Sequence, residues 1–384
     1  MTGYGTVAGG SEQWLLSALR HSPQLRIRAI VLQPGPLADA LSGLGASVTV
    51  IPTGTDTKAM LGAAKEIETL LRRDRPDVVL GNGVKAMLAV IGPARLLGLP
   101  TVWVKHDHSY DSIAPLLGRL VSKVVPTAAE VGKPTKRFDA VVIEPERPPT
   151  PLSREAARDE FARLSGRPLA SGPTSESSAG PASEHPSDTS DSPVLAMIGR
   201  LVPYKGVDVA IGALAYPPAR RWRLVVIGAD DVATPGESVR LRALAEQLGV
   251  ADRVLFAGGL PGAGSLLAAF DALAVLTRPG QPGAPTKEGF GITATEAMLA
   301  GIPVIVAGEG PVARRLATPD GPAGMVVRPG DALACAEALA ALSDPRVRQE
   351  FGARGRVAAL EQPDAQAVAD RLAAVLADMA GRGA

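Results

Sequence analysis

The most informative run in the sequence is Glu288-Gly-Phe-Gly-Ile-Thr-Ala-Thr-Glu-Ala-Met-Leu-Ala-Gly-Ile-Pro303. Its Gly-Phe-Gly turn requires small residues, because only these turn tightly without a steric cost. From Ile292 the pattern becomes helical, and Glu296 falls in the first turns. Gly301 then ends the helix, and a short buried strand resumes at 303–306. The run therefore predicts a turn, a helix and a strand in close succession.

Two carboxylates flank the amino end of this predicted helix. Glu288 lies in the loop and Glu296 lies on the helix, with the free N–H groups of the first turn opening between them. Such an end attracts anions, so the pair suggests a ligand that carries hydroxyls next to a phosphate. The alternative is a Glu that merely complements the helix dipole. The paired spacing around Gly-Phe-Gly favours the ligand.

Composition describes an ordinary globular protein. The 384 residues are enough for two or three domains, each with its own core. Lys+Arg (40) and Asp+Glu (39) nearly cancel, so no bulk electric field favours nucleic acid as a partner. Two local basic groups are interpreted as solvated helix ends, with contact to an anionic membrane as the alternative: Arg72, Arg73 and Arg75, and Lys133, Lys136 and Arg137.

Cysteine usage and hydropathy bear on location. The single cysteine, Cys335, excludes an intrachain disulfide and fits a reducing compartment. The sequence shows neither a signal peptide nor an apolar run of about 18 residues. We therefore expect a cytoplasmic protein, with peripheral membrane association as an open alternative.

The beginning of the chain resembles the start of a nucleotide-binding α/β domain. Gly9-Gly10-Ser11-Glu12 leads into a run with Trp14, Leu15, Ala18 and Leu19 at helical spacing. A glycine loop that enters a helix is typical of such a domain. No strand is recognisable before the loop, so we expect the first strand of the N-terminal sheet to be missing.

Strands and helices then alternate along the chain, which implies doubly wound parallel sheets in an α/β fold. Expected strands are 26–32, 47–51, 77–80, 101–105, 124–125, 140–143, 194–198, 223–227, 254–256, 272–276, 303–306 and 325–327. Expected helices are 37–44, 58–71, 84–97, 154–164, 207–214, 238–248, 265–270, 332–342, 345–360 and 364–379. In such sheets ligands bind beyond the carboxyl ends of the strands.

His106 lies at one of these carboxyl ends. His106-Asp107-His108 could also supply metal ligands, but adjacent residues on an extended chain point apart, so we do not favour a metal site.

Residues 166–193 are rich in Ser, Pro and Gly and cannot bury enough apolar surface to offset their ordering entropy. We interpret them as a disordered linker. The expected domains are an N-terminal Rossmann-like domain (1–150), a helix with the linker (151–193), a C-terminal α/β domain (194–362) and a final helix that packs back on the N-terminal domain (363–384).

A second motif completes the pattern. In Ile198-Gly-Arg-Leu-Val-Pro-Tyr-Lys-Gly206, Arg200 and Lys205 follow a strand and flank a helix N-terminus, where two cations can meet a diphosphate. Together with the Glu288–Glu296 run and Gly9-Gly10, this motif resembles the retaining nucleotide-sugar glycosyltransferases of family 4, or group 1. The resemblance implies the GT-B fold, in which two Rossmann-like domains face each other across a cleft.

The resemblance also implies a role for each matching residue. Arg200 and Lys205 would hold the donor diphosphate, Glu296 would bind the ribose and Glu288 the transferred sugar. His106 would reach the sugar near the reacting carbon. Implied catalytic residues are His106, Glu288, Arg200 and Lys205. Implied donor-binding residues are Gly9, Gly10, Arg200, Lys205, Gly258, Gly259, Leu260, Glu288, Gly289, Phe290, Gly291, Ile292 and Glu296.

The predicted function is transfer of a sugar from a nucleoside diphosphate to a sugar, lipid or small-molecule acceptor, with retention of configuration. Fixed cations and a helix N-terminus can stabilise the leaving diphosphate, so we expect no metal and no other cofactor. A UDP-sugar is favoured over a GDP-sugar as donor. The alternatives are an epimerase or phosphorylase of the same fold, and a non-catalytic descendant that only binds a nucleotide sugar.

Overall fold

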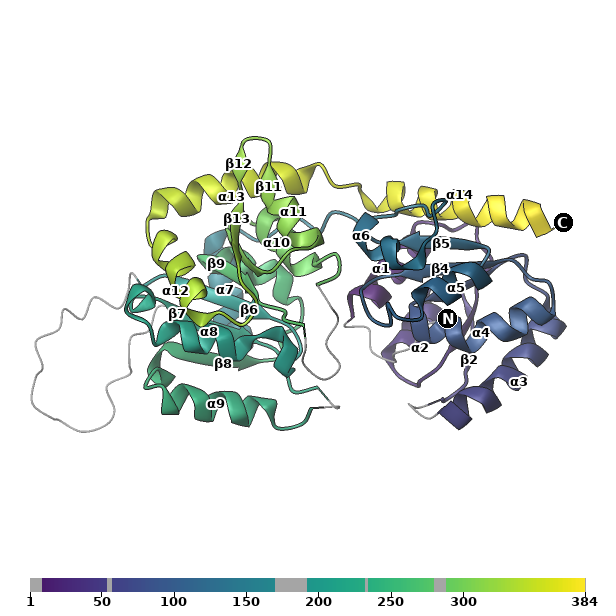
Figure 1. Cartoon of the computed structure of the whole chain (residues 1–384), viewed down its shortest axis with the longest axis horizontal. Coiled ribbons are helices and arrows are strands. Elements are labelled where there is room, and N and C mark those ends of the chain that lie inside the picture. The colour runs from purple at the N-terminus through teal and green to yellow at the C-terminus, as the bar shows by residue number, and fades with distance from the viewer. Residues whose placement is uncertain (1–8, 54–56, 170–191, 232–233, 280–287, 384) are drawn as a thin grey trace, which may run out of the picture. The chain divides into compact units, whose positions relative to one another are not determined.

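The computed structural model describes residues 9–53, 57–169, 192–231, 234–279 and 288–383. They belong to two compact units, each with its own sheet and helices (Figure 1). The N-terminal unit comprises Met1–Arg147, Glu288–Phe290 and Gln362–Ala384. The C-terminal unit comprises Pro148–Lys287 and Gly291–Glu361.

The C-terminal unit is built on a parallel sheet in the order β13-β10-β9-β6-β7-β8. Its strands are β6 (Val194–Ile198), β7 (Arg223–Ile227), β8 (Val254–Gly258), β9 (Ala272–Val275), β10 (Val304–Ala307) and β13 (Gly324–Val327). All of these strands are parallel. From β6 the strands β7 and β8 follow toward one edge of the sheet, and from β9 the strands β10 and β13 follow toward the other edge. The sheet order therefore reverses between β6 and β9, which are hydrogen-bonded neighbours.

Helices cover both faces of this sheet (Figure 1). The α-helices are α7 (Arg154–Ser165), α8 (Val207–Leu214), α9 (Glu237–Gln247), α10 (Ile292–Leu299), α11 (Pro311–Leu316), α12 (Ala332–Ala341) and α13 (Pro345–Leu360). The 3-10 helices are η3 (Pro203–Lys205), η4 (Pro217–Ala219), η5 (Ala251–Arg253) and η6 (Ala263–Ala269), and Ala317–Thr318 (β11) pairs with Gly321–Pro322 (β12) in a small hairpin.

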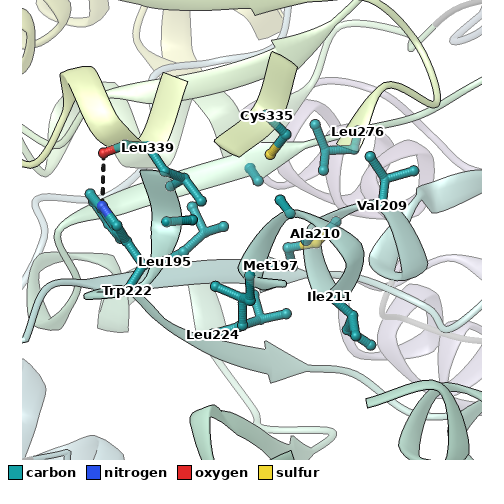
Figure 2. Packing of buried hydrophobic residues seen from close by; sticks show 14 of the residues in the cluster. Leu195, Met197, Val209, Ala210, Ile211, Trp222, Leu224, Leu276, Cys335 and Leu339 are labelled. Carbon is teal, nitrogen blue, oxygen red and sulfur yellow. Dashed lines mark hydrogen bonds between the residues drawn. The ribbon is translucent and has the colours of Figure 1, made fainter. Parts of the chain in front are cut away.

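Alternate residues of each strand supply two separate cores, as the period of two in a strand requires. On one face, Leu195 and Leu224 pack with α8 and α12 (Figure 2). On the other face, Ala196 packs with α7, η6 and α10. Helix α7 is thus part of the C-terminal unit, where Phe161 is fully buried against the Phe270 ring.

The first of these cores contains the indole of Trp222 and the thiol of Cys335. The indole N–H of Trp222 donates to the carbonyl of Leu339 at 2.7 Å, tying β7 to α12 (Figure 2). Cys335, on the same helix, is fully buried, and burial raises the pKa of its thiol to about 12.

The N-terminal unit has parallel strands in two groups, β1-β2 and β3-β4-β5. The strands are β1 (Arg28–Val31), β2 (Ser47–Val50), β3 (Val79–Asn82), β4 (Thr101–Lys105) and β5 (Lys123–Pro126). The helices are α1 (Gly10–Arg20), α2 (Pro36–Gly43), α3 (Thr57–Asp74), α4 (Val84–Leu96), α5 (Ala114–Leu120), α6 (Ala129–Gly132), the 3-10 turn η1 (Lys133–Thr135) and α14 (Ala365–Gly383).

Helix α14 ends the chain in the core of this unit. Its residues Val368 and Leu372 are buried with Trp14 of α1 and with Val102 of β4. Outside the core, Arg371 donates to the carbonyl of Val142 at 2.7 Å. The last helix therefore belongs to the first unit in space, although the whole second unit precedes it in sequence.

Some elements differ from expectation. Residues 140–143 are not a strand: Val141 and Ile143 donate to the carbonyls of Val124 and Pro126, but the segment forms no ladder, and Pro145 soon follows. Residues expected as a helix at 265–270 form the tighter 3-10 helix η6. Helices α5, α6 and α11 were not predicted, because each is too short to show a periodic pattern.

The interpretation of residues 166–193 as a disordered linker lies largely outside the described residues, since 170–191 are not described. The expectation that a first strand is missing concerns residues 1–8, which also lie outside them.

Two glycines of α13 allow a matched test of packing. A Cβ at Gly352 would lie 1.9 Å from the carbonyl oxygen of Gly301, whereas a Cβ at Gly355 would first meet the Met298 side chain at 3.3 Å. Alanine favours a helix interior over glycine by about 1 kcal/mol at either position. We expect Gly355→Ala to change stability little and Gly352→Ala to lower it by about 1–3 kcal/mol through overpacking. Thermal unfolding of the two variants measures this, and equal melting temperatures would contradict the packing.

Candidate functional site

The candidate donor site lies where the order of the C-terminal sheet reverses. Strand β6 ends at Ile198, and Gly199-Arg200 follow it; strand β9 ends at Val275, and Arg278 follows shortly after. Because the two strands are parallel neighbours, both chain segments leave the sheet at the same edge. This is the position where open α/β sheets bind their ligands.

Arg200 and Lys205 lie on one short loop between β6 and α8. The Arg200 guanidinium forms an ion pair with Asp231, and its Nη2 donates to the Tyr204 hydroxyl at 3.2 Å. Its side chain is nevertheless 63% exposed. Lys205 ends η3 and is half-buried. Both cations therefore lie on the edge of the sheet where an anion would bind.

Helix α10 begins at the same edge. Gly291 caps it with a left-handed backbone (φ 74°), and the N–H groups of Ala294 and Thr295 donate to the Gly291 carbonyl. Arg315 of α11 holds this first turn from the side, donating to Thr295 Oγ1 at 3.3 Å. The N–H groups that precede Ala294 have no helical carbonyl to pair with, as in any α-helix.

Glu296 lies in the second turn of α10 and is largely buried. Burial raises the pKa of its carboxyl group to about 7. Its carboxylate packs directly over the backbone of η6: a Cβ at Gly264 would lie only 2.1 Å from Glu296 Oε1. Among the described residues no ion pair involves Glu296. The site thus holds an acid that no neighbouring cation neutralises.

The turn that leads into η6 starts at the end of β8. Gly258 accepts a backbone hydrogen bond from Gly228 at 2.8 Å, so this turn is tied to the end of β7. Gly259 is exposed, and Leu260 packs partly against the core beneath α10. The turn therefore runs along the same edge and continues to Gly264 and Glu296.

In the N-terminal unit, Gly9 caps α1, and Gly10 is its first residue. The first turn of α1 is linked to the end of β3, because Nδ2 of Asn82 donates to the Ser11 carbonyl at 3.1 Å. His106 follows β4, and its Nε2 lies 2.6 Å from Asn82 Oδ1. The glycine loop and the histidine are thus connected through one amide.

This amide fixes the protonation of His106. Since the Asn82 NH₂ group donates to Ser11, the oxygen faces His106, and Nε2 must carry the proton. Burial lowers the pKa of His106 to about 4, so the ring is neutral at pH 7. Trp14 packs edge-on against the ring at 5.5 Å between centroids. His106 therefore presents an unprotonated Nδ1 that can accept a hydrogen bond.

A buried lysine shapes the loop that carries His106. Lys105, fully buried, forms an ion pair with Asp111 at 2.7 Å and donates to the Asp107 carbonyl. The other oxygen of Asp111 lies 2.9 Å from His108 Nδ1. His106 and His108 thus engage different partners. In the described part of the chain no cluster of three His, Cys, Asp or Glu side chains could hold a metal.

The structure groups the expected residues by unit. The C-terminal unit carries Arg200, Lys205, Gly258, Gly259, Leu260, Gly291, Ile292 and Glu296 at one edge of its sheet. The N-terminal unit carries Gly9, Gly10 and His106, and the segment Glu288–Phe290, which includes Gly289 and a buried Phe290, also groups with it by its contacts.

Sequence reasoning missed several neighbours of these residues. They are Asn82, the last residue of β3, and Tyr204, Asp231 and Arg278, which lie in the loops beyond other strand ends. For Asn82, its place between two glycines at the end of an expected strand was a usable signal. Asp231 gave none, because its partner is 31 residues away in sequence.

Two of the basic residues noted in the sequence, Arg72 and Arg137, make contacts at helix ends. Arg72 pairs with Glu68 one helical turn earlier at 2.7 Å, on the surface of α3. Arg137 donates to the carbonyls of Gly118 and Val121 at the end of α5 and pairs with Asp139.

Comparison with known proteins shows a similar family and a similar fold. Residues 183–358 match the family described as Glycosyl transferases group 1. The Anabaena protein HepE, solved with UDP and glucose, aligns over 98% of this chain and 97% of its own, with a TM-score of 0.74 at 19% identity. WaaG, a glycosyltransferase involved in lipopolysaccharide biosynthesis, aligns over 98% and 97% with a TM-score of 0.67 and 19% identity. The chain therefore has the GT-B fold, as expected.

Curated proteins with known activities also resemble part of this chain. The D-inositol 3-phosphate glycosyltransferase of Acidothermus cellulolyticus is 37% identical over 174 residues, which are 44% of this chain and 37% of the relative. The GDP-mannose-dependent alpha-(1-6)-phosphatidylinositol monomannoside mannosyltransferase of Mycolicibacterium smegmatis is 34% identical over 194 residues, 48% of each chain. The matches thus span less than half the length of these relatives. Together with the family match, they show that part of this chain is similar to group 1 glycosyltransferases.

Across the described ranges, no helix combines the length and apolar character that a bilayer crossing requires.

The raised pKa of Glu296 predicts how stability depends on pH. Between pH about 4.5 and 7 the folded chain keeps a proton that the unfolded chain releases, so the free energy of unfolding falls as the pH rises through this window. Glu296→Gln removes the ionisation. We expect the variant to gain up to about 3 kcal/mol over the wild type between pH 4.5 and 8. Urea unfolding at both pH values measures the gain; parallel curves would mean that Glu296 ionises normally.

The Lys105–Asp111 pair predicts a strong effect on stability. Asp111→Ala leaves a buried ammonium without its carboxylate, so we expect a loss of about 3–5 kcal/mol. Adding Lys105→Met should recover most of it. Asp378→Ala, which removes an exposed pair with Arg382, should change stability by less than about 1 kcal/mol. Thermal unfolding distinguishes these; equal losses in the Asp111 single and double variants would contradict the buried pair.

Proposed function

We propose that this protein transfers a sugar from a nucleoside diphosphate to a hydroxyl of a lipid, glycan or small-molecule acceptor, with retention of anomeric configuration. The observation that carries the proposal is the edge of the C-terminal sheet. There, two cations (Arg200 and Lys205), the start of α10 and the unpaired acid Glu296 lie on neighbouring loops. These are the groups that a diphosphate with an attached ribose would need.

The reaction places negative charge on the leaving diphosphate. Arg200 and Lys205 stabilise that charge as it develops, and so do the N–H groups at the start of α10. Removing one such charged contact typically costs a few kcal/mol of transition-state stabilisation, or about 10²–10³ in rate. With this stabilisation in place, a divalent metal is not needed.

The acidic residues bind the neutral parts of the donor. Glu296 accepts hydrogen bonds from the ribose hydroxyls, for which its lack of a cationic partner leaves it available. Glu288 accepts from hydroxyls of the transferred sugar, and the N–H groups of Phe290 and Ile292 line the sugar and phosphate. The turn from Gly258 to Leu260 passes near the base.

His106 acts on the sugar as a neutral group. With its proton on Nε2, its Nδ1 accepts a hydrogen bond near the anomeric carbon. Retention then follows from a front-face reaction. The glycosyl–phosphate bond breaks, the acceptor oxygen bonds to the same face of the anomeric carbon, and the acceptor proton passes to the leaving phosphate.

The donor and acceptor are proposed by class. A UDP-sugar is favoured, since fold neighbours were solved with UDP, and a GDP-sugar is second, since one relative is named as GDP-mannose-dependent. The relatives named for inositol phosphate and phosphatidylinositol support a phosphorylated or lipid-linked polyol among the acceptors. A lipid acceptor would bring the chain to a membrane surface, where exposed Lys133, Lys136 and Phe138 could make peripheral contact. The cytoplasmic location stays a prediction.

The alternatives of an epimerase, a phosphorylase or a non-catalytic binder are not favoured by any residue of the site. They remain distinguishable outcomes of the same assay. An epimerase would convert the donor without an acceptor, and a binder would hold the donor without turnover.

Donor-site variants test the proposal. After a thermal-shift screen of UDP- and GDP-sugars, in which a ligand at 100 times its dissociation constant adds about 2.7 kcal/mol, transfer is measured with the best donor. Lys205→Ala and Glu296→Ala should each lower transfer by at least about 10². Each variant removes one polar contact with the diphosphate or the ribose.

The controls lie on the surface of the same unit. Arg163→Ala and Glu361→Ala should keep wild-type activity, because both side chains are exposed and lie in α7 and at the end of α13, not at the carboxyl ends of the strands. Full activity in either donor-site variant, with its fold intact by circular dichroism, would refute the assignment of the donor site.

A further inference from the structure

Arg278 clamps the turn that carries the two donor-site cations. It lies just beyond β9, and its backbone N–H donates to the Tyr204 carbonyl at 2.9 Å. Its Nη2 donates to the Pro203 carbonyl at 3.1 Å and to Asp208 Oδ2 at 2.6 Å. Arg278 therefore contacts Pro203 and Tyr204 in the turn between β6 and α8, and Asp208 in the first turn of α8.

The turn is also pressed against β9 by its own backbone. Gly206 has a left-handed conformation (φ 74°), and a Cβ there would lie 2.4 Å from the Leu276 carbonyl oxygen. No other residue type could take this position without moving the turn. Gly206 and Arg278 thus hold the turn against the same strand end from its two sides.

The clamped turn determines where the cations point. Lys205 is part of it, and the Tyr204 hydroxyl accepts a hydrogen bond from Arg200 at 3.2 Å. A shift of the turn would move Lys205 directly and Arg200 through Tyr204. Such shifts matter, because a misplacement of about 1 Å can cost about 10²-fold.

The clamp is a poor device for stability alone. Arg278 and Asp208 are only 18% and 19% exposed, and Arg278 Nε and Asp208 Oδ1 are buried without a hydrogen-bond partner among the described residues. A pair that leaves two buried polar atoms unsatisfied costs desolvation energy that uncharged side chains would avoid. Its position at the strand ends fits a role in orientation.

We propose that Arg278 is a positioning residue for the donor diphosphate, which it orients through the turn from Pro203 to Lys205 without contacting the donor. The inference rests on the donor site proposed above. Arg278 lies outside the two motifs that carry the resemblance, Ile198–Gly206 and Glu288–Met298.

The test separates orientation from stability. Arg278→Met in combination with Asp208→Asn removes both charges of the pair, so the melting temperature should stay close to that of the wild type. Titration calorimetry with UDP and with GDP should nevertheless show binding about 10- to 100-fold weaker for whichever nucleotide the wild type binds. Hydrogen exchange of the peptide spanning residues 201–207 should rise. Arg163→Ala, which removes an exposed arginine paired with Glu160 on α7, should change neither.

A double-mutant cycle checks the route of the effect. In a Lys205→Ala background, Arg278→Met combined with Asp208→Asn should weaken binding less than in the wild type, because one of the two cations that the turn orients is absent. Equal fold-changes in the two backgrounds, or unchanged binding and exchange, would overturn the positioning role while leaving the donor site standing. A wild-type chain that binds neither nucleotide would overturn the proposed function and this inference together.

Discussion

The proposed donor site of this protein depends on the contact between the Gly206 turn and the end of β9. A parallel sheet brings all its strand ends to one edge, but it leaves open how far each following loop stands from that edge. Here the backbone of Gly206 packs on the Leu276 carbonyl with no room for a side chain. The loop with Arg200 and Lys205 is therefore fixed to the strand beside its own. That contact joins two strands that are neighbours in space but lie far apart along the chain.

Opposite requirements meet at this edge. A site for a charged leaving group needs exposed cations, whereas the recognition of hydroxyl groups needs an acid that no cation occupies. The structure separates the two by burial. Arg200 is largely exposed, while Glu296 lies low against the backbone at Gly264, where burial raises its pKa to about 7. In the N-terminal unit, burial lowers the pKa of His106 and so keeps the ring neutral.

Regular elements were predictable where their pattern was long. The alternation of strands and helices predicted doubly wound parallel sheets, and strands such as β4, β6 and β7 begin and end where expected. The motif resemblance implied the GT-B fold, which the structural neighbours confirm. Short helices such as α5 and α11 were missed, because one or two turns show no period. The contacts around the candidate site, such as Arg200 with Asp231 and Arg278 with Asp208, depend on tertiary proximity between distant segments, which a single sequence does not encode locally.

The burial of Cys335 has a practical consequence. The sequence holds no other cysteine, and this thiol is fully enclosed between α12 and the sheet, with a pKa of about 12 (Figure 2). Thiolates add to maleimides, and the Cys335 thiol is buried and protonated at neutral pH, so the natural chain should contribute little background to maleimide labelling. A cysteine introduced at one exposed position in each unit would carry a fluorophore or spin label selectively. The separation between the two units could then be followed in solution without first removing a native thiol.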